Sequence, residues 1–63
     1  MKMNEIDERI KYNKKAVESL RRYRELGDFS KFSESELIIA TCEYLEEIEY
    51  LNELKKKLNK HDN

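Results

Sequence analysis

The sequence predicts an all-α protein: a two-helix antiparallel hairpin that dimerises into a four-helix bundle. The chain has no proline, a single glycine and many Glu, Lys, Leu and Arg residues, which is typical of helical bundles. Its apolar residues recur at helical spacing on both sides of the glycine. A chain of 63 residues buries little surface by itself, so self-association is the expected source of further stability.

The whole chain, residues 1–63, is expected to be one domain, with a first helix at about residues 4–26. The apolar stripe of this helix consists of Met3, Ile6, Ile10, Val17 and Leu20, with Ala16, Tyr23 and Leu26 widening it. Asn4 is a candidate N-cap, and Gly27 is a candidate stop because glycine adopts the left-handed conformation that ends helices. Asn13 falls within the stripe, either as a buried amide that fixes the register of an oligomer or as a half-exposed residue at the stripe edge.

A turn at residues 27–32 is followed by a second helix at about residues 33–60 and a frayed tail at 61–63. Ser33 and Glu36 have the spacing of a capping box, and Phe32 and Leu37 have that of a hydrophobic staple. The seam of this helix is formed by Leu37, Thr41, Tyr44, Ile48, Leu51 and Leu58. The short turn requires the two helices to pack antiparallel.

The distribution of charged residues along the chain is consistent with this antiparallel alignment. Residues 1–28 contain eight basic and six acidic residues, whereas residues 29–63 contain five and eight. In the predicted hairpin the basic stretch 11–15 lies beside the acidic stretch 46–49, and the acidic stretch 5–8 lies beside the basic stretch 55–57. Such surface pairs select an alignment and contribute little stability.

The second helix is apolar over more of its circumference than one neighbouring helix covers, chiefly between residues 37 and 45. The residues expected to face a second copy or another partner are Ile38, Ile39, Cys42, Leu45, Tyr50 and Leu54. A homodimer is the simplest explanation, because two hairpins form a closed four-helix bundle. The alternative is that these are scattered exposed apolar residues. The apolar neighbours of Cys42 favour a buried, inert thiol.

No pattern in the sequence indicates catalysis, a cofactor or a metal site: one cysteine and one histidine form neither a disulfide nor a metal cluster. No stretch has the pattern of a signal peptide or a membrane span. We therefore expect a non-enzymatic protein without membrane contact, in the cytoplasm of a bacterium or of an infected host cell.

Exposed cations are predicted on one face of the first helix, at Lys11, Lys14, Lys15, Arg21 and Arg22. In length, helix count and turn position the chain resembles the plasmid-encoded RNA-binding Rop hairpins, which implies that this face contacts nucleic acid. Glu18 and Glu25 lie on the same face at helical pairing distances, so a self-neutralised surface is the favoured interpretation. The start of the second helix also resembles that of small sporulation phosphatases. Their Ser-Gln-Glu-Leu-Asp signature is interrupted in "SESEL", and Ile38 follows Leu37 where they have aspartate, so phosphatase activity is not carried over.

The functional hypothesis is a small self-associating regulator or inhibitor, of the kind that phages and plasmids encode, which binds the surface of a larger protein. The alternatives are a nucleic-acid-binding hairpin and a structural subunit of a larger assembly.

Overall fold

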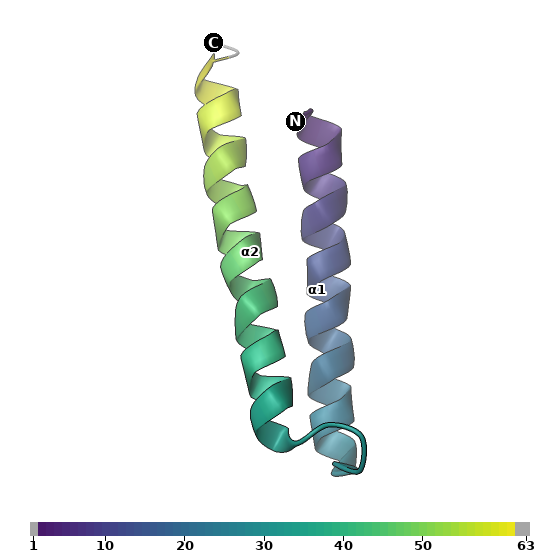
Figure 1. Cartoon of the computed structure of the whole chain (residues 1–63). Helices are drawn as coiled ribbons and strands as arrows, with labels where there is room; N and C mark the ends of the chain where they lie inside the picture. Colours follow the sequence, from purple (N-terminus) through teal and green to yellow (C-terminus); the bar gives the residue numbers. More distant parts are fainter. Residues whose placement is uncertain (1, 62–63) are drawn as a thin grey trace.

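The structure is a computed structural model that describes residues 2–61. Helix α1, Met3–Leu26, and helix α2, Glu34–His61, lie side by side and antiparallel, and both chain ends lie at the end of the hairpin opposite the turn (Figure 1). The resulting rod measures 50 × 16 × 15 Å. The predicted all-α hairpin is therefore confirmed, whereas its dimerisation stays a prediction.

The seam between the helices follows the predicted stripes. Its side chains recur in alternating steps of three and four residues, the spacing of helices that wind around each other. The buried core consists of Ile6, Ile10 and Leu51, with Ile48, Leu54 and Leu58 packed against it. This core lies in the half of the hairpin that holds the chain ends, which we call the open half.

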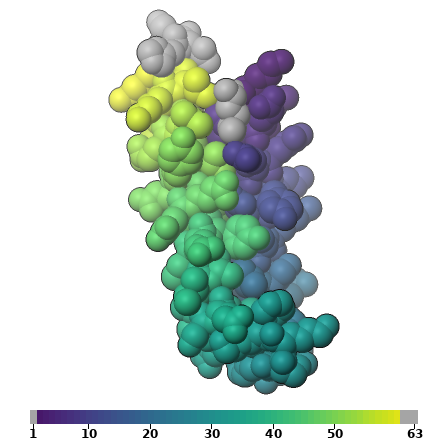
Figure 2. Space-filling model, viewed as in Figure 1, coloured from purple at the N-terminus to yellow at the C-terminus, as the bar shows by residue number. Residues whose placement is uncertain are grey.

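The half next to the turn, the turn half, is held together differently. Val17 and Leu37 are buried there, and the ring of Phe32 lies edge-on to that of Tyr23 with centroids 6.2 Å apart. In Figure 2 the side chains of the connection and of the start of α2, coloured teal, cover this end of the rod. Leu26 was expected to widen the apolar stripe, but this prediction is wrong because 79% of its surface is exposed just before the chain leaves α1.

The ends of the helices confirm two of the three predicted caps. Gly27 has the left-handed φ of 72° and donates its N–H to the carbonyl of Arg24. The Glu36 N–H donates to Ser33 Oγ at 3.1 Å, and the Ser33 N–H donates to Glu36 Oε1 at 3.5 Å, so the capping box is present. Asn4 is not the N-cap of α1: Lys2 is, through its carbonyl, which leaves Asn4 inside the first turn.

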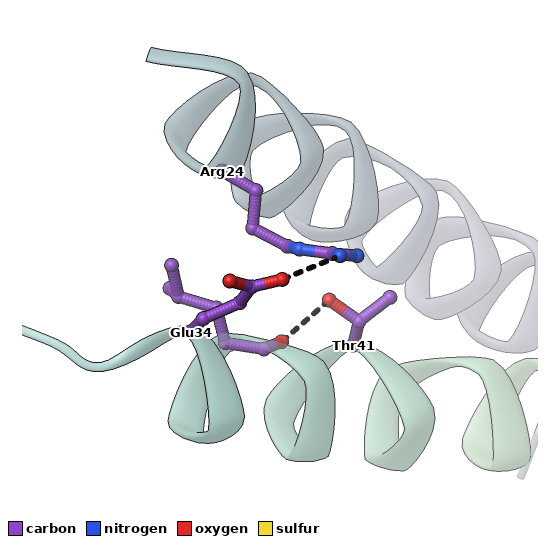
Figure 3. Close-up of polar contacts among 4 residues, drawn as sticks. Arg24, Glu34 and Thr41 are labelled. Carbon is purple, nitrogen blue, oxygen red and sulfur yellow. Dashed lines mark hydrogen bonds and ion pairs between the residues drawn. The ribbon is translucent and has the colours of Figure 1, made fainter. Parts of the chain in front are cut away.

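The connection is fixed by two polar contacts. The carboxylate of Asp28 accepts a hydrogen bond from the Ser30 N–H, and its hydrogen bonds to Ser30 lower the pKa of Asp28 below the ordinary value of 3.8. Arg24 at the end of α1 forms an ion pair with Glu34 at the start of α2, at 3.4 Å (Figure 3). Both partners are largely exposed, so this pair stabilises the turn by only about a few tenths of a kcal/mol.

The predicted alignment of the two helices is found, but only one of the two pairs of charged stretches forms an ion pair. Lys55 forms an ion pair with Asp7 at 2.7 Å, as expected for the acidic stretch 5–8 beside the basic stretch 55–57. Among residues 2–61 no ion pair joins the basic stretch 11–15 to the acidic stretch 46–49. The second helix continues through His61, and residues 62–63 of the expected frayed tail lie outside the described part of the chain.

Candidate interaction surfaces

The packing of α1 on α2 leaves an open groove along each side of the seam. The first, the Asn13 groove, has a volume of about 610 Å³ and is lined by Glu5, Arg9, Tyr12, Asn13, Tyr44 and Glu47, together with Glu8. The second, the lysine groove, has a volume of about 370 Å³ and is lined by Lys11, Lys14, Lys15 and Lys55, with Asp7, Ile10, Glu18 and Asn52. At about 100° per residue, Tyr12 and Lys14 lie on opposite flanks of α1, so the two grooves lie on opposite sides of the hairpin.

Two polar residues are buried in the seam, and they differ in how their hydrogen bonds are satisfied. Thr41 donates its hydroxyl to the carbonyl of Leu37 at 2.7 Å, within its own helix (Figure 3). Asn13 is only 3% exposed, and its Nδ2 has no hydrogen-bond partner among the described residues. A buried donor without a partner costs about 1–3 kcal/mol. Asn13 is therefore the least satisfied group of the described seam.

Tyrosines and small residues surround this amide. Tyr12 is 67% exposed, and Tyr44 is half-buried beside it. Ala16 follows Tyr12 by one helical turn, and the groove continues along α2 past Ala40. Tyrosine rings are common at interfaces because they combine an apolar body with a polar end.

Apolar side chains of α2 lie on the other flank, mostly in the turn half. Ile38, Cys42 and Leu45 form one row at helical spacing and are all exposed; we call this row the apolar strip. Leu45 also lines a separate pocket of about 270 Å³ on this flank, together with Val17 and Ile48 and the charged residues Lys14, Glu18 and Arg21. Ile39 and Tyr50 are more exposed still, at 59% and 65%, on the outer surface of α2.

Two of the expected interface residues have other surroundings within the single chain than the sequence suggested, whereas their place in an interface stays a prediction. Leu54 is half-buried and packs against the core of the hairpin itself, because the seam of a coiled pair of helices shifts around α2 toward its C-terminal end. Cys42 is an exposed free thiol in the single chain and not a buried one, since the seam runs along Thr41 and Tyr44 and leaves Cys42 on the flank.

The basic face of α1 is exposed at all five predicted positions, Lys11, Lys14, Lys15, Arg21 and Arg22. The expected pairing with Glu18 and Glu25 is not observed: the ion pairs of residues 2–61 are Arg24–Glu34, Lys55–Asp7 and Lys56–Glu53. The cations of this face therefore point into solvent without a direct acidic partner in the described part of the chain.

Among the described residues, no group of three or more His, Cys, Asp or Glu side chains is placed to hold a metal ion. No helix within residues 2–61 combines the length and the apolar character needed to cross a membrane. Comparison with known protein families, with curated proteins and with solved structures gives no match. The function is therefore argued from the two grooves and the apolar strip.

Sequence reasoning missed the Asn13 groove as a surface, although it singled out Asn13. A signal was present: Tyr12, Ala16 and Tyr23 follow one another at steps of four and seven residues, which aligns them along one flank of α1. Because tyrosine and alanine are less apolar than leucine and isoleucine, these three residues were interpreted as the edge of the apolar stripe of α1 and not as a separate surface.

Proposed function

We propose that this chain is a small non-enzymatic interaction protein that self-associates into a four-helix bundle and binds the surface of a larger protein as a regulator or inhibitor. The observation that carries the proposal is the exposure of large apolar side chains at Ile38, Ile39 and Leu45, on a helix whose opposite side is already packed. Exposed apolar groups gathered on one element are typical of interaction sites.

The small core supports the self-association. Only five apolar side chains are buried among the described residues: Ile6, Ile10, Val17, Leu37 and Leu51. Domains of this size commonly need a disulfide, a metal or an oligomer for stability, and a single cysteine cannot form an internal disulfide. A second copy supplies the missing burial without another component.

Static light scattering at micromolar concentration tests the self-association. The proposal predicts twice the chain mass of 7.7 kDa, or a higher multiple. A cooperatively folded species with the mass of one chain contradicts it.

The binding of a larger protein is tested with two variants at exposed positions, of which only one is expected to lose the partner. Ile39→Lys places a charge in the exposed apolar surface of α2, whereas Lys14→Glu changes the charge of α1. A protein retained from host extract by the wild type and by Lys14→Glu, but lost with Ile39→Lys, supports the proposal. Loss with Lys14→Glu alone contradicts it, provided that circular dichroism shows both variants to be helical.

The second candidate function is nucleic-acid binding by the lysine groove. It is favoured by one observation: Lys11, Lys14 and Lys15 line the groove together, and none has a direct ion-pair partner within residues 2–61. Phosphate contacts release counterions, so such binding weakens linearly with the logarithm of salt concentration. Binding of RNA that persists at physiological salt and disappears when Lys14, Lys15, Arg21 and Arg22 are replaced would establish this function over the first.

A further inference from the structure

We infer that the second copy of the chain docks on the side of the hairpin that carries the apolar strip, antiparallel to the first copy. The two-fold axis lies beside Lys14 of α1 and between Cys42 and Leu45 of α2. The inference rests on the self-association proposed above and names its face and its register. Ile39 and Tyr50, on the outer surface of α2, then stay free for the larger protein.

The apolar strip matches itself when it is reversed. Ile38, Cys42 and Leu45 are all exposed in the single chain. An axis between Cys42 and Leu45 places each of these two residues opposite the other in the second copy. The pocket beside Leu45 is lined by Val17 and Ile48, so Leu45 of the second copy meets apolar side chains there. Burial of such side chains is the main favourable term in protein association.

The charged row of α1 next to the strip is also complementary to itself. This row follows steps of three and four residues and consists of Asp7, Lys11, Lys14, Glu18 and Arg21. When it is reversed about Lys14, Asp7 lies opposite Arg21. Lys11 then lies next to Glu18, and each of these pairs occurs twice by symmetry. Only the two Lys14 side chains form a like-charged contact. Complementary charges of this kind fix the register of an interface.

The two patterns place the axis at the same height, although they lie on different helices. The ion pair of Arg24 and Glu34 relates the heights of α1 and α2. Ten residues before Arg24 and ten residues after Glu34, Lys14 lies level with the stretch between Cys42 and Leu45. Lys14 and Leu45 also line one pocket together. A single axis therefore satisfies both patterns, as a closed two-fold dimer requires.

The overlap of the two copies is large enough for a dimer. Lys14 lies close to the midpoint of Met3–Leu26, so the axis superposes nearly the whole of α1 on its counterpart. At about 1.5 Å per residue and a rod width of 16 Å, each copy covers about 550 Å² of the other. The total of about 1,100 Å² exceeds the roughly 1,000 Å² that a specific interface needs.

The opposite side of the hairpin fits a second copy less well. Among the described residues, no exposed aliphatic side chain lines the Asn13 groove, and the charges there are Glu5, Glu8 and Glu47 against Arg9. Two copies of this acidic groove repel each other. An axis along the rod, on the side of the apolar strip, is also unfavourable, because it sets the charged row of one copy on the apolar strip of the other.

Reversal of charges on α1 tests the register. Lys11→Glu and Glu18→Lys each turn two attractive contacts into repulsive ones, so each should raise the dimer dissociation constant at low salt about tenfold. The double variant exchanges the two charges and should restore the wild-type constant. Lys11 and Glu18 are two helical turns apart within one chain, so contact between copies explains such a restoration. The control is Glu8→Lys, the same reversal in the Asn13 groove, which should leave the constant unchanged. Sedimentation equilibrium measures all four variants.

Leu45→Glu tests the apolar strip. It places two carboxylates beside the axis, so the dissociation constant should rise by about a hundredfold or more. The control is Leu26→Glu, the same change at a more exposed leucine at the end of α1, on the flank of Tyr12. Circular dichroism shows whether both variants stay helical.

Disulfide cross-linking gives a readout that does not depend on the stability of Leu45→Glu. In a Cys42→Ser background, Lys14→Cys places a thiol beside the proposed axis, and Tyr12→Cys places one on the opposite flank of α1. With diamide as the oxidant, two thiols form one disulfide and the diamide takes up the two hydrogens. The Lys14→Cys protein should cross-link into dimers much faster than the Tyr12→Cys protein.

The outcomes separate the two proposals. A wild-type protein that is monomeric overturns both the self-association and this inference. A dimer whose dissociation constant is not restored by the exchange of Lys11 and Glu18, or that cross-links faster through Tyr12→Cys than through Lys14→Cys, overturns only this inference and leaves the self-association in place.

Discussion

The open half of the hairpin buries Ile6, Ile10 and Leu51, whereas the turn half leaves Ile38, Ile39 and Leu45 in contact with solvent. Both halves belong to the same two helices, and the turn half is the richer in apolar residues, chiefly between residues 37 and 45. In the open half the aliphatic side chains lie in the seam and are covered by the opposite helix, and the exposed apolar rings are those of Tyr12 and Tyr50. In the turn half the aliphatic side chains extend around the flank of α2, where a single neighbouring helix does not reach.

This difference shows that the apolar side chains of the two halves are covered to different extents. The open half is stabilised by burial of apolar surface, the dominant favourable term in folding. The turn half combines the buried Val17 and Leu37 and the Tyr23–Phe32 contact with local hydrogen bonds at the Gly27 stop, the Asp28–Ser30 contact and the Ser33–Glu36 capping box. Local hydrogen bonds define where helices begin and end, but each adds only about 1 kcal/mol. The turn half is therefore the part of the molecule that gains most from a partner.

Leu51→Ala should have the largest effect on stability. Its side chain is fully buried, and truncation of a buried leucine costs about 2–5 kcal/mol through lost burial and a residual cavity. Leu45→Ala removes the same atoms from a partly exposed site, so we expect a clearly smaller loss. Urea denaturation compares the two variants. Equal losses at a concentration where light scattering shows single chains would contradict the proposed contrast between the two halves.

Ser33→Ala should have an intermediate effect, of about 1 kcal/mol, because the Glu36 N–H loses its acceptor at the start of α2. Glu36→Ala should cost less, since its hydrogen bond to the Ser33 N–H is long. The control is Ser35→Ala, which changes another exposed serine two residues further along the chain. If thermal unfolding shows that Ser33→Ala is silent and Ser30→Ala destabilises, α2 begins earlier than the structure indicates.

Asp28→Ala should have the smallest effect, and one that depends on pH. Hydrogen bonds to Ser30 lower the pKa of Asp28 in the folded protein, so its contribution to stability is fully present above the unfolded-state pKa of 3.8. It is lost as the pH falls through the lower folded-state pKa. The melting temperatures of wild type and Asp28→Ala should therefore differ slightly at neutral pH and converge in acid. Asp28→Asn, which keeps an acceptor without the charge, should lie between them at neutral pH; a difference that grows in acid would contradict this explanation.

Much of the fold was predictable because the signals are local or periodic. The capping box at Ser33 and Glu36 and the stop at Gly27 are short patterns with a direct backbone cause, and the seam follows from the spacing of its apolar residues. The N-cap of α1 was predicted wrongly because the first free N–H groups of the helix donate to the backbone carbonyl of Lys2. A backbone carbonyl can belong to any residue type, so the sequence contains no signal for it.

The surfaces were harder to predict. A helical wheel with a fixed angle groups Leu54 with Ile39 and Tyr50, but the seam drifts by about 20° per heptad around α2, and Leu54 is covered as a result. The direct pairing of the basic stretch 11–15 was also predicted wrongly, because long exposed side chains gain little from being held in one ion-pair geometry. The identity of a partner depends also on the surface of that partner, which this sequence does not describe.

The dependence of the melting temperature on protein concentration tests most directly whether a second copy completes this fold. If unfolding is coupled to dissociation, mass action raises the melting temperature as the concentration increases. We predict a single cooperative transition that shifts upward steadily between micromolar and millimolar protein. A cooperative transition at the same temperature throughout this range would show that the hairpin of residues 2–61 is stable alone, and would contradict the proposal that it is one half of a bundle.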